Sequence, residues 1–168
     1  MKVALVLVGP KGSGKSTLCS RLAERFDMRF VRVEPLFLEV RARVGASSPD
    51  FERLGFQAVL ERLTSELADH DRVCFESTGA SAWTPWLLER LAATARVLPV
   101  RVRADPAQCV ERIRTRDASI HIPVSDDQIE RINTLAERVT LAWAAEIDNR
   151  GPLDVDAATA RIAPLLER

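Results

Sequence analysis

The chain has 168 residues, with 24 basic residues against 24 acidic residues and a formal net charge of zero. A chain of this length supports one good core, so we expect residues 1–168 to form a single α/β domain. Zero net charge provides no global field that draws the protein to nucleic acid, and extended nucleic-acid binding is not expected. The sequence contains no apolar run of membrane-spanning length and starts without a cleavage site, so we expect neither a membrane span nor a signal peptide.

The three cysteines, Cys19, Cys74 and Cys109, are widely spaced and odd in number. Each lies in an apolar or helical context. This pattern favours reduced thiols in a cytoplasmic protein over disulfides or a zinc site.

Gly9 to Thr17 reads Gly-Pro-Lys-Gly-Ser-Gly-Lys-Ser-Thr and matches the pattern Gly-x-x-x-x-Gly-Lys-[Ser/Thr]. Its glycines allow a loop to wrap a phosphate with N–H groups pointing inward, and a following helix adds the positive end of its dipole. Lys15 then reaches the β- and γ-phosphates, and the Ser16 hydroxyl ligates Mg²⁺. The residues expected to hold the nucleotide in this loop are Gly9, Lys11, Gly12, Ser13, Gly14, Lys15, Ser16 and Thr17.

The context of this stretch supports a nucleotide-binding loop. An apolar run of strand length, 2–8, precedes it, and apolar residues at helical spacing follow it over 16–26. Strand, glycine loop and helix is the arrangement that the motif requires. The alternative is a glycine-rich turn without a ligand. We expect the chain to bind a nucleoside triphosphate.

The rest of the chain alternates between strand and helix patterns. The expected strands are 28–33, 72–76, 96–103 and 142–147. The expected helices are 36–44, 50–68, 83–93, 107–115, 129–139 and 155–166, with an irregular segment at 116–124. Such alternation predicts a parallel sheet with helices on both faces.

Ligands of open parallel sheets bind beyond the carboxyl ends of the strands, where two acidic residues are expected. Glu76 follows the apolar residues 73–75 as a Walker B acid does, and we expect it to hold Mg²⁺ or orient the acceptor. Glu34 ends the second strand and is expected to face the γ-phosphate and accept the proton of an attacking hydroxyl. The alternatives are a carboxylate that caps a turn at 76 and a solvated charge at 34.

Arg112 and Arg116 lie on and just after one predicted helix, and their spacing of four residues puts them on one face. Aimed at the cleft, this pair would neutralise charge on a transferred phosphoryl group. Only three of the 24 basic residues are lysines, so arginine is the usual base here and a solvated helix face is the alternative. Arg114 is expected to point elsewhere.

Four further residues have open interpretations. His121 is interpreted as a surface imidazole rather than a catalytic one. Trp83 and Trp86 favour core packing over stacking on a base. Gly79 either allows close approach of a substrate or belongs to an ordinary turn.

Taken together, the glycine loop, Glu76, the Arg-x-x-x-Arg of 112–116 and the Asp-Asn-x-Gly of 148–151 resemble the small P-loop kinases. This group holds shikimate kinase, gluconate kinase, chloramphenicol phosphotransferase, zeta toxin and polynucleotide kinase. The resemblance implies a three-layer α/β/α sandwich with a five-stranded parallel sheet in the order 2-3-1-4-5. It also implies a short lid, about 112–127, that closes over ATP bound with Mg²⁺.

The resemblance assigns roles by position. It places residues 12–17 around the phosphates and Mg²⁺, and it makes Arg112 and Arg116 the lid arginines. Glu34 falls where such kinases place a substrate-facing aspartate. The loop beside adenine corresponds to 149–152, with Asn149, Gly151 and Pro152.

The chain also departs from individual members of the group. Glu76-Ser-Thr-Gly79 replaces the Gly-Gly-Gly segment of shikimate kinase, so the residues do not support shikimate as the acceptor. No adenylate-kinase-like insertion is present, which argues against a nucleoside monophosphate. A local patch of Arg41, Arg43 and Arg53 leaves a nucleic-acid end open as an acceptor.

The sequence therefore predicts an ATP- and Mg²⁺-dependent kinase that phosphorylates a hydroxyl group of a small molecule or nucleic-acid end. It does not decide whether the nucleotide is ATP or GTP, whether Glu34 or Glu76 is the base, or whether the protein is a monomer or a dimer. The alternatives are a nucleotide hydrolase or switch, which needs a residue such as Gln57 or Gln128 to orient water, and a non-catalytic nucleotide sensor.

Overall fold

The structure, a computed structural model, describes residues 1–115, 121, 122, 124–152 and 154–167. Its strands are β1 (Val3–Val8), β2 (Arg29–Val31), β3 (Arg72–Ser77), β4 (Arg96–Arg103) and β5 (Ala145–Asp148). Its helices are α1 (Lys15–Phe26), α2 (Val33–Val44), α3 (Phe51–Asp69), α4 (Thr84–Ala92), α5 (Pro106–Thr115), α6 (Asp126–Arg138) and α7 (Val155–Leu166). The predicted alternation of strands and helices is confirmed.

The described strands form a five-stranded parallel sheet in the predicted order β2-β3-β1-β4-β5. The central strand β1 is buried along its whole length, which explains its unbroken apolar sequence. Its last residue, Val8, lies opposite Ser77 of β3 and Arg101 of β4. The carboxyl ends of these strands therefore meet at one edge of the sheet, next to the glycine loop.

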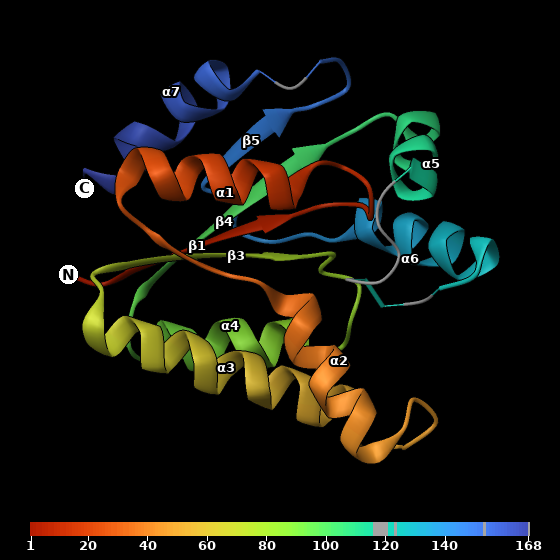
Figure 1. The fold of residues 1–168 in the computed structure, drawn as a ribbon. Helices are drawn as coiled ribbons and strands as arrows, with labels where there is room; N and C mark the ends of the chain where they lie inside the picture. The colour runs from red at the N-terminus through yellow and green to blue at the C-terminus, as the bar shows by residue number, and fades with distance from the viewer. Residues whose placement is uncertain (116–120, 123, 153, 168) are drawn as a thin grey trace.

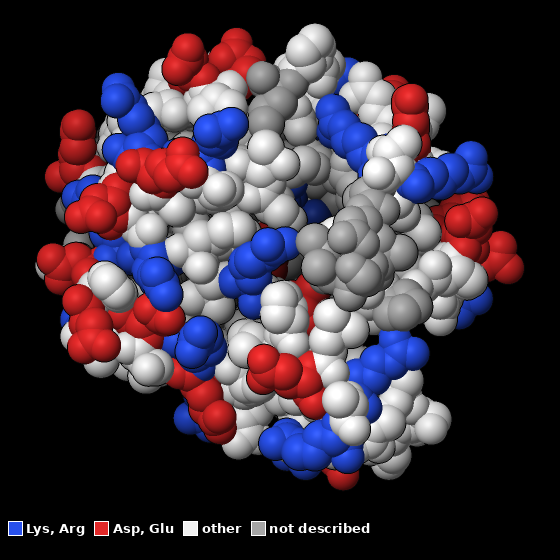
Figure 2. Space-filling view, in the orientation of Figure 1, with Lys and Arg blue, Asp and Glu red and all other residues white. Residues whose placement is uncertain are grey.

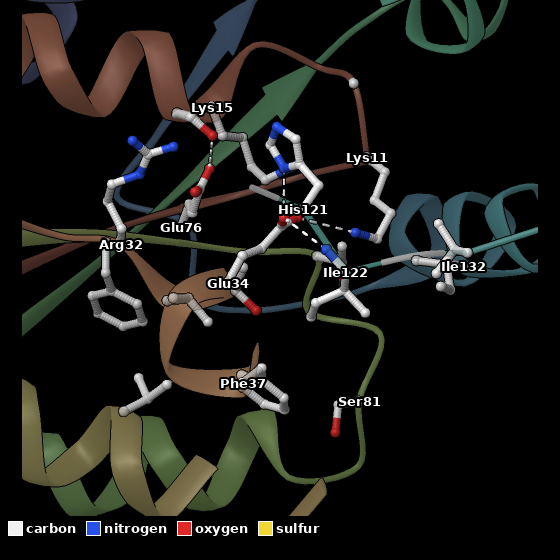
Figure 3. A pocket seen from close by; sticks show the side chains of 18 of the residues that line it. Lys11, Lys15, Arg32, Glu34, Phe37, Glu76, Ser81, His121, Ile122 and Ile132 are labelled. Carbon is white, nitrogen blue, oxygen red and sulfur yellow. Dashed lines mark hydrogen bonds and ion pairs between the residues drawn. The ribbon is translucent and has the colours of Figure 1, made fainter. Parts of the chain in front are cut away.

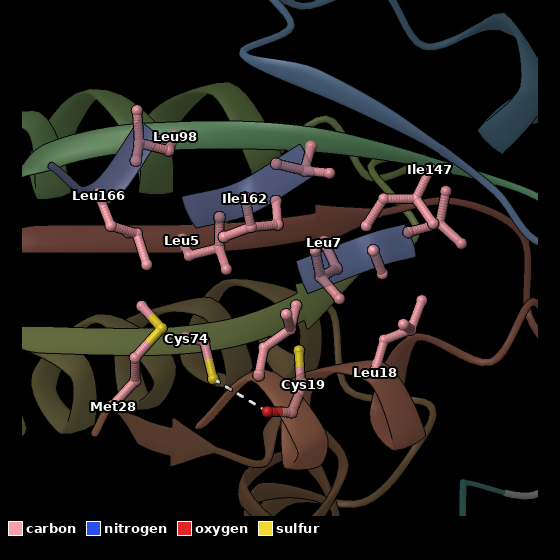
Figure 4. Close-up of a cluster of buried hydrophobic side chains, with 14 of the residues drawn as sticks. Leu5, Leu7, Leu18, Cys19, Met28, Cys74, Leu98, Ile147, Ile162 and Leu166 are labelled. Atoms are coloured by element: carbon pink, nitrogen blue, oxygen red, sulfur yellow. Dashed lines mark hydrogen bonds between the residues drawn. The ribbon is translucent and has the colours of Figure 1, made fainter. Parts of the chain in front are cut away.

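Helices cover both faces of the sheet, and alternate residues of β1 face opposite cores. Figure 1 shows α1 and α7 on one side and α3 and α4 on the other. Leu5 and Leu7 point toward α1 and α7, where they join a buried cluster that includes Leu18 and Ile162 (Figure 4). Val6 belongs to the second cluster, under α3 and α4. The three-layer α/β/α architecture is thus confirmed.

The main difference from the prediction lies at α2. β2 ends at Val31 and α2 begins at Val33, so Glu34 lies in the first turn of a helix and not at the end of a strand. Pro35 is compatible with both structures. It can end a strand, and it is also tolerated in the first turn of a helix, because an N–H in that turn would have no hydrogen-bond partner within the helix. The start of this helix therefore carries a carboxylate toward the sheet edge.

Two other boundaries test the sequence patterns. A capping box is present at the start of α6: the Ser125 hydroxyl accepts from the Gln128 N–H, and the Gln128 side chain accepts from the Ser125 N–H. β5 starts at Ala145 rather than at residue 142. The Trp143 N–H donates to the Leu141 carbonyl in a local turn, and pairing with β4 begins with the Ala144 N–H, which donates to the Pro99 carbonyl.

The surface matches the balanced composition. Figure 2 shows basic and acidic side chains interspersed over the visible face. Within the described ranges, no helix is both long and apolar enough to cross a bilayer.

Candidate active site

The glycine loop connects β1 to α1 and is enclosed by two later segments of the chain. Gly12 and Gly14 have φ angles of +80° and +86°, a region that favours glycine. A Cβ at Gly12 would lie 2.3 Å from the Cys109 carbonyl oxygen of α5, and one at Gly14 would lie 2.6 Å from Asn149 Nδ2. These two glycines are therefore required both by the backbone angles and by the neighbouring atoms.

Lys15, the first residue of α1, folds back across the loop. Its Nζ donates to the Pro10 carbonyl at 2.6 Å and lies 3.4 Å from Ser13 Oγ. Burial lowers the pKa of Lys15 to about 8, while the Glu76 carboxylate opposes this shift and Lys11 adds to it. A phosphate group in the loop would give this buried cation a negatively charged partner, whereas the Pro10 carbonyl offers only a partial negative charge.

Ser16 and Glu76 meet beside the loop. The Ser16 hydroxyl donates to Glu76 Oε2 at 2.5 Å, which joins the first turn of α1 to the end of β3. Hydroxyl and carboxylate oxygens suit Mg²⁺, which usually keeps several waters and binds substrate phosphates. No cluster of three or more His, Cys, Asp or Glu side chains that could bind a metal occurs among the described residues. A metal at this position would thus depend on Ser16, Glu76, water and a nucleotide.

Arg112 and Asn149 flank the loop from α5 and from the end of β5. Arg112 lies 3.4 Å from each of the carbonyl oxygens of Gly12 and Gly151. Asn149 is buried, and its side-chain amide donates to the Ser13 carbonyl at 2.7 Å. Arg112 therefore lies over the loop, whereas Asn149 braces the loop backbone.

Glu34 joins three parts of the site. Its carboxylate lies 3.3 Å from Lys11 Nζ, 2.5 Å from His121 Nδ1 and 3.3 Å from the Ile122 N–H, which donates to it (Figure 3). His121 is therefore not a surface imidazole, and that prediction is wrong: its side chain is only 16% exposed because it packs onto Glu34. The first turn of α2 is thereby tied to the glycine loop and to the segment before α6.

Asn133 of α6 is a site residue that the sequence interpretation missed. Its Oδ1 accepts from the Lys11 N–H at 2.7 Å, and its Nδ2 donates to the Lys11 carbonyl at 3.2 Å. A signal was present, because Asn133 lies four residues after buried Ile129 and three before buried Ala136, so it is a polar residue on the buried face. A side chain in such a position needs a partner, and here the partner is the phosphate loop.

The other candidates lie away from the loop or outside the described residues. Arg116 and the neighbouring lid residues 117–120 and 123 fall outside them, so the roles of Arg116 and of the lid stay predictions. Arg114 pairs with Asp126 at the surface. Trp83 and Trp86 pack edge to face against each other and the core, as expected. Gly79 has a φ of +72° and lies against Val8, which fits a packed turn glycine.

A cavity of about 650 Å³ starts at the phosphate loop and extends between α2, α3 and the sheet edge. Lys15, Ser16, Glu76 and Arg112 line its phosphate end. Glu34 lies on its wall, and phenylalanines of α2 and α3 line the part beyond the loop. The cavity therefore has room for a second molecule next to a bound triphosphate.

The sheet order, the glycine loop and the Ser16–Glu76 pair define a P-loop protein of the small-kinase superfamily. A family model described as an AAA domain, AAA_33, matches residues 5–139. The chain belongs to this family.

Curated relatives include shikimate kinases. The chain is 34% identical over 117 residues to the shikimate kinase of Xanthomonas euvesicatoria pv. vesicatoria, a match that covers 67% of this chain and 63% of the relative. It is 33% identical over 144 residues to that of Halorhodospira halophila, with 80% and 75% covered. The first of these matches spans somewhat less than two thirds of the relative's length.

Solved structures with a similar fold include other kinases. A sugar kinase from Janibacter sp. HTCC2649 matches with a TM-score of 0.71 at 13% identity, covering 99% of this chain and 95% of that one. The Mycobacterium tuberculosis APS kinase in complex with AMPPNP and APS matches with 0.68 at 14%, covering 99% and 98%. A gluconokinase from Sinorhizobium meliloti matches with 0.65 at 20%, covering 98% and 93%. At these identities the matches establish the fold alone.

Proposed function

We propose that the chain is a kinase that transfers the γ-phosphoryl group of ATP to a hydroxyl group of a small molecule. The observation that carries this proposal is the continuity of the cavity, which runs from Lys15 and Ser16 past Glu34 into a further chamber. A kinase needs space for an acceptor in line with the triphosphate, whereas a simple hydrolase needs space only for water.

In this proposal the loop from Gly9 to Thr17 holds the phosphates with its N–H groups. When ATP binds, Lys15 moves from the Pro10 carbonyl to the β- and γ-phosphates. Arg112 moves from the carbonyl oxygens that it contacts at 3.4 Å to the negative charge of these phosphates. Asn149 holds the backbone of the loop through its hydrogen bond to the Ser13 carbonyl. Gly151 and Pro152 border the nucleotide beyond Arg112, and Arg116 joins Arg112 when the lid closes.

Ser16 and Glu76 are the proposed Mg²⁺ site. Their oxygens already lie within hydrogen-bond distance of each other at the loop, which suits an ion shared between protein, water and nucleotide. Bound there, Mg²⁺ would offset the negative charge that builds up on the phosphates during transfer. Because Glu76 would bind Mg²⁺ here, the role of the base falls to Glu34, which lies on the cavity wall.

Glu34 is the proposed general base. The acceptor oxygen attacks the γ-phosphorus while the bond from this phosphorus to the β–γ bridging oxygen breaks, so that ADP leaves and the hydroxyl proton passes to the Glu34 carboxylate. Lys11 and His121 hold this carboxylate in place on the cavity wall. His121 is thereby a positioning residue that the segment before α6 contributes to the site.

The two glutamines considered for the hydrolase and switch alternatives have partners of their own. The Gln57 side chain donates to Glu61 on the surface of α3 at 3.0 Å. Gln128 takes part in the capping box of α6. Both side chains thus have structural partners, which favours the kinase.

A nucleic-acid end is a weaker candidate acceptor than a small molecule. Arg53, in the proposed basic patch, forms an ion pair with Asp50 at 3.0 Å. On the face that Figure 2 shows, basic and acidic side chains are mixed, which gives a strand no continuous basic path there. We further propose that residues 1–168 act as one cytoplasmic kinase domain, in keeping with the three buried free cysteines.

The test is ATP consumption by the purified chain with and without hydroxyl acceptors. The panel includes shikimate, because the curated relatives are shikimate kinases, together with gluconate, sugars, nucleosides, aromatic alcohols and 5′-hydroxyl oligonucleotides. A rise in ADP formation with one acceptor, and its phosphorylated product in the mass spectrum, supports the kinase. A slow rate that no acceptor changes supports the hydrolase, and tight binding without turnover supports the sensor.

A further inference from the structure

The acceptor end of the cavity has a wall of three aromatic rings. The ring of Phe37 on α2 stands edge-on to Phe51 at 5.8 Å between centroids and to Phe56 at 5.4 Å, both residues of α3. Edge-to-face pairs of this kind are favourable and fix the rings relative to one another. All three residues line the cavity. The wall is therefore a rigid apolar surface and not a set of loose side chains.

Gly55 of α3 makes room for this wall. A Cβ at Gly55 would lie 2.3 Å from Cε1 of Phe37, so the ring packs directly on the helix backbone. Glycine inside a helix lowers helix stability, because it has more conformational freedom to lose than any other residue. The close approach of the Phe37 ring gives this glycine a packing role at the acceptor cavity.

Apolar side chains from other elements complete the chamber. Val59 of α3 and Ile132 of α6 line it, and Ile122 does so next to Glu34. Figure 3 shows Phe37 and Ile122 near Glu34, with Ile132 farther along toward α6. The chamber is thus lined by the aromatic rings of α2 and α3 and by branched aliphatic side chains of α3, α6 and the segment before α6.

The carboxylates that line the cavity already have partners within the protein. Glu52 accepts from the Ser81 hydroxyl at 2.5 Å, Glu76 accepts from Ser16, and Glu34 is held by Lys11 and His121. Arg32, Ser77 and Thr78 also line the cavity, with Arg32 beside Glu76 (Figure 3). Against the phenylalanine, valine and isoleucine side chains, however, a polyhydroxylated acceptor would lose hydration without equivalent new hydrogen bonds. An apolar ring would instead gain from burial and from contact with the aromatic wall.

We propose that the acceptor is a hydroxyl compound with a flat apolar body, such as an aromatic alcohol, and not a sugar or a polyhydroxylated acid. This inference rests on the proposed kinase function. The hydroxyl points to Glu34 and the γ-phosphate, and the ring lies in the chamber of Phe37, Phe51 and Phe56. The surface that selects the acceptor is thus apolar, and the polar groups select the phosphate donor.

The experiment compares acceptors on the full chain with ATP and Mg²⁺. Benzyl alcohol and 2-phenyl-1,3-propanediol are the aromatic probes, and shikimate, gluconate and glucose are the polar ones. We expect kcat/KM for an aromatic probe to exceed that for every polar probe by about tenfold or more, the discrimination that a few buried apolar contacts supply.

The outcomes separate the two proposals. Faster phosphorylation of shikimate, gluconate or glucose than of both aromatic probes overturns the apolar acceptor and leaves the kinase standing. If no probe increases ADP formation, the proposed function fails and the inference fails with it.

A matched pair of variants locates the effect. Phe51→Leu removes one ring from the wall, and Phe26→Leu changes a similarly half-buried phenylalanine at the far end of α1. We expect Phe51→Leu to raise KM for the aromatic probe about fivefold with KM for ATP unchanged, and Phe26→Leu to change neither. Equal effects of the two variants, or a parallel change in KM for ATP, would contradict the assignment of the wall to the acceptor.

Discussion

The phosphate end of the cavity is held together by polar bonds, whereas the acceptor end is held together by packed rings. At the phosphate end, hydrogen bonds from Asn133, Asn149 and Arg112 reach the backbone of the glycine loop. At the acceptor end, Phe37 packs edge-on to Phe51 and Phe56. The difference suggests that one end is built to fix a common donor and the other to select an acceptor by shape.

Replacement of Lys15 should have the largest effect on the phosphate end. We expect Lys15→Ala to lower kcat/KM by about 1,000-fold, because it removes the charge that binds the transferred phosphoryl group. The fold should stay intact, since a buried cation is itself costly. Steady-state kinetics and thermal unfolding measure both. Activity close to the parent level would contradict the proposed role of Lys15.

Glu76→Gln should have the next largest effect. It keeps the shape of the side chain but removes the charge that the proposed Mg²⁺ site requires, so we expect kcat to fall by about 100-fold. The loss should shrink as Mg²⁺ is raised, which a titration at saturating ATP measures. If the fall in kcat stays the same at every Mg²⁺ concentration, Glu76 has a structural role and does not bind the metal.

Arg112→Ala tests the arginine over the loop, and Arg114→Ala on the same helix is its control. Loss of a charged contact with phosphate should lower kcat/KM by about tenfold for Arg112→Ala. Arg114 is exposed and pairs with Asp126, so its variant should behave like the parent. Similar losses in the two variants would show that the helix as a whole matters and not the position of Arg112.

Asn133→Ala should weaken the support of the loop more than the chemistry. The variant loses two hydrogen bonds to the Lys11 backbone, and we expect the free energy of unfolding to fall by about 2 kcal/mol. Thr134→Ala, at an exposed neighbouring position, is the control and should change it little. Chemical denaturation measures both, and an unchanged Asn133→Ala variant would remove the proposed brace.

The lowered pKa of Lys15 should produce the smallest of these effects, an uptake of protons when a nucleotide binds. With a pKa of about 8, Lys15 is half protonated at pH 8 in the free chain, and phosphate charge should restore the proton. Binding of AMPPNP at pH 8 should therefore take up about half a proton, and affinity should fall as the pH rises above 8. Calorimetry in buffers of different ionisation enthalpy measures this uptake. Lys15→Arg should abolish it, and equal uptake by that variant would assign the proton elsewhere.

The sequence predicted the phosphate end better than the acceptor end, for a physical reason. The loop from Gly9 to Thr17 is one continuous segment whose spacing is set by phosphate geometry, and the order of the sheet followed from the family resemblance. Asn133 and His121 reach the site only through the packing of distant segments. The helical pattern could show that Asn133 needs a partner, but not that the partner is the glycine loop. The aromatic wall was equally hidden, because a phenylalanine in a core helix and one on a cavity wall look alike in sequence.

The central claim is tested most directly by acceptor-dependent phosphorylation. Purified chain, ATP and Mg²⁺ are incubated with each acceptor in turn, and the phosphorylated acceptor is quantified by mass spectrometry beside the ADP released. The account predicts equal amounts of ADP and phosphorylated acceptor with at least one acceptor, and neither with Lys15→Ala. ADP formed at one rate with and without every acceptor, and no phosphorylated product, would contradict it.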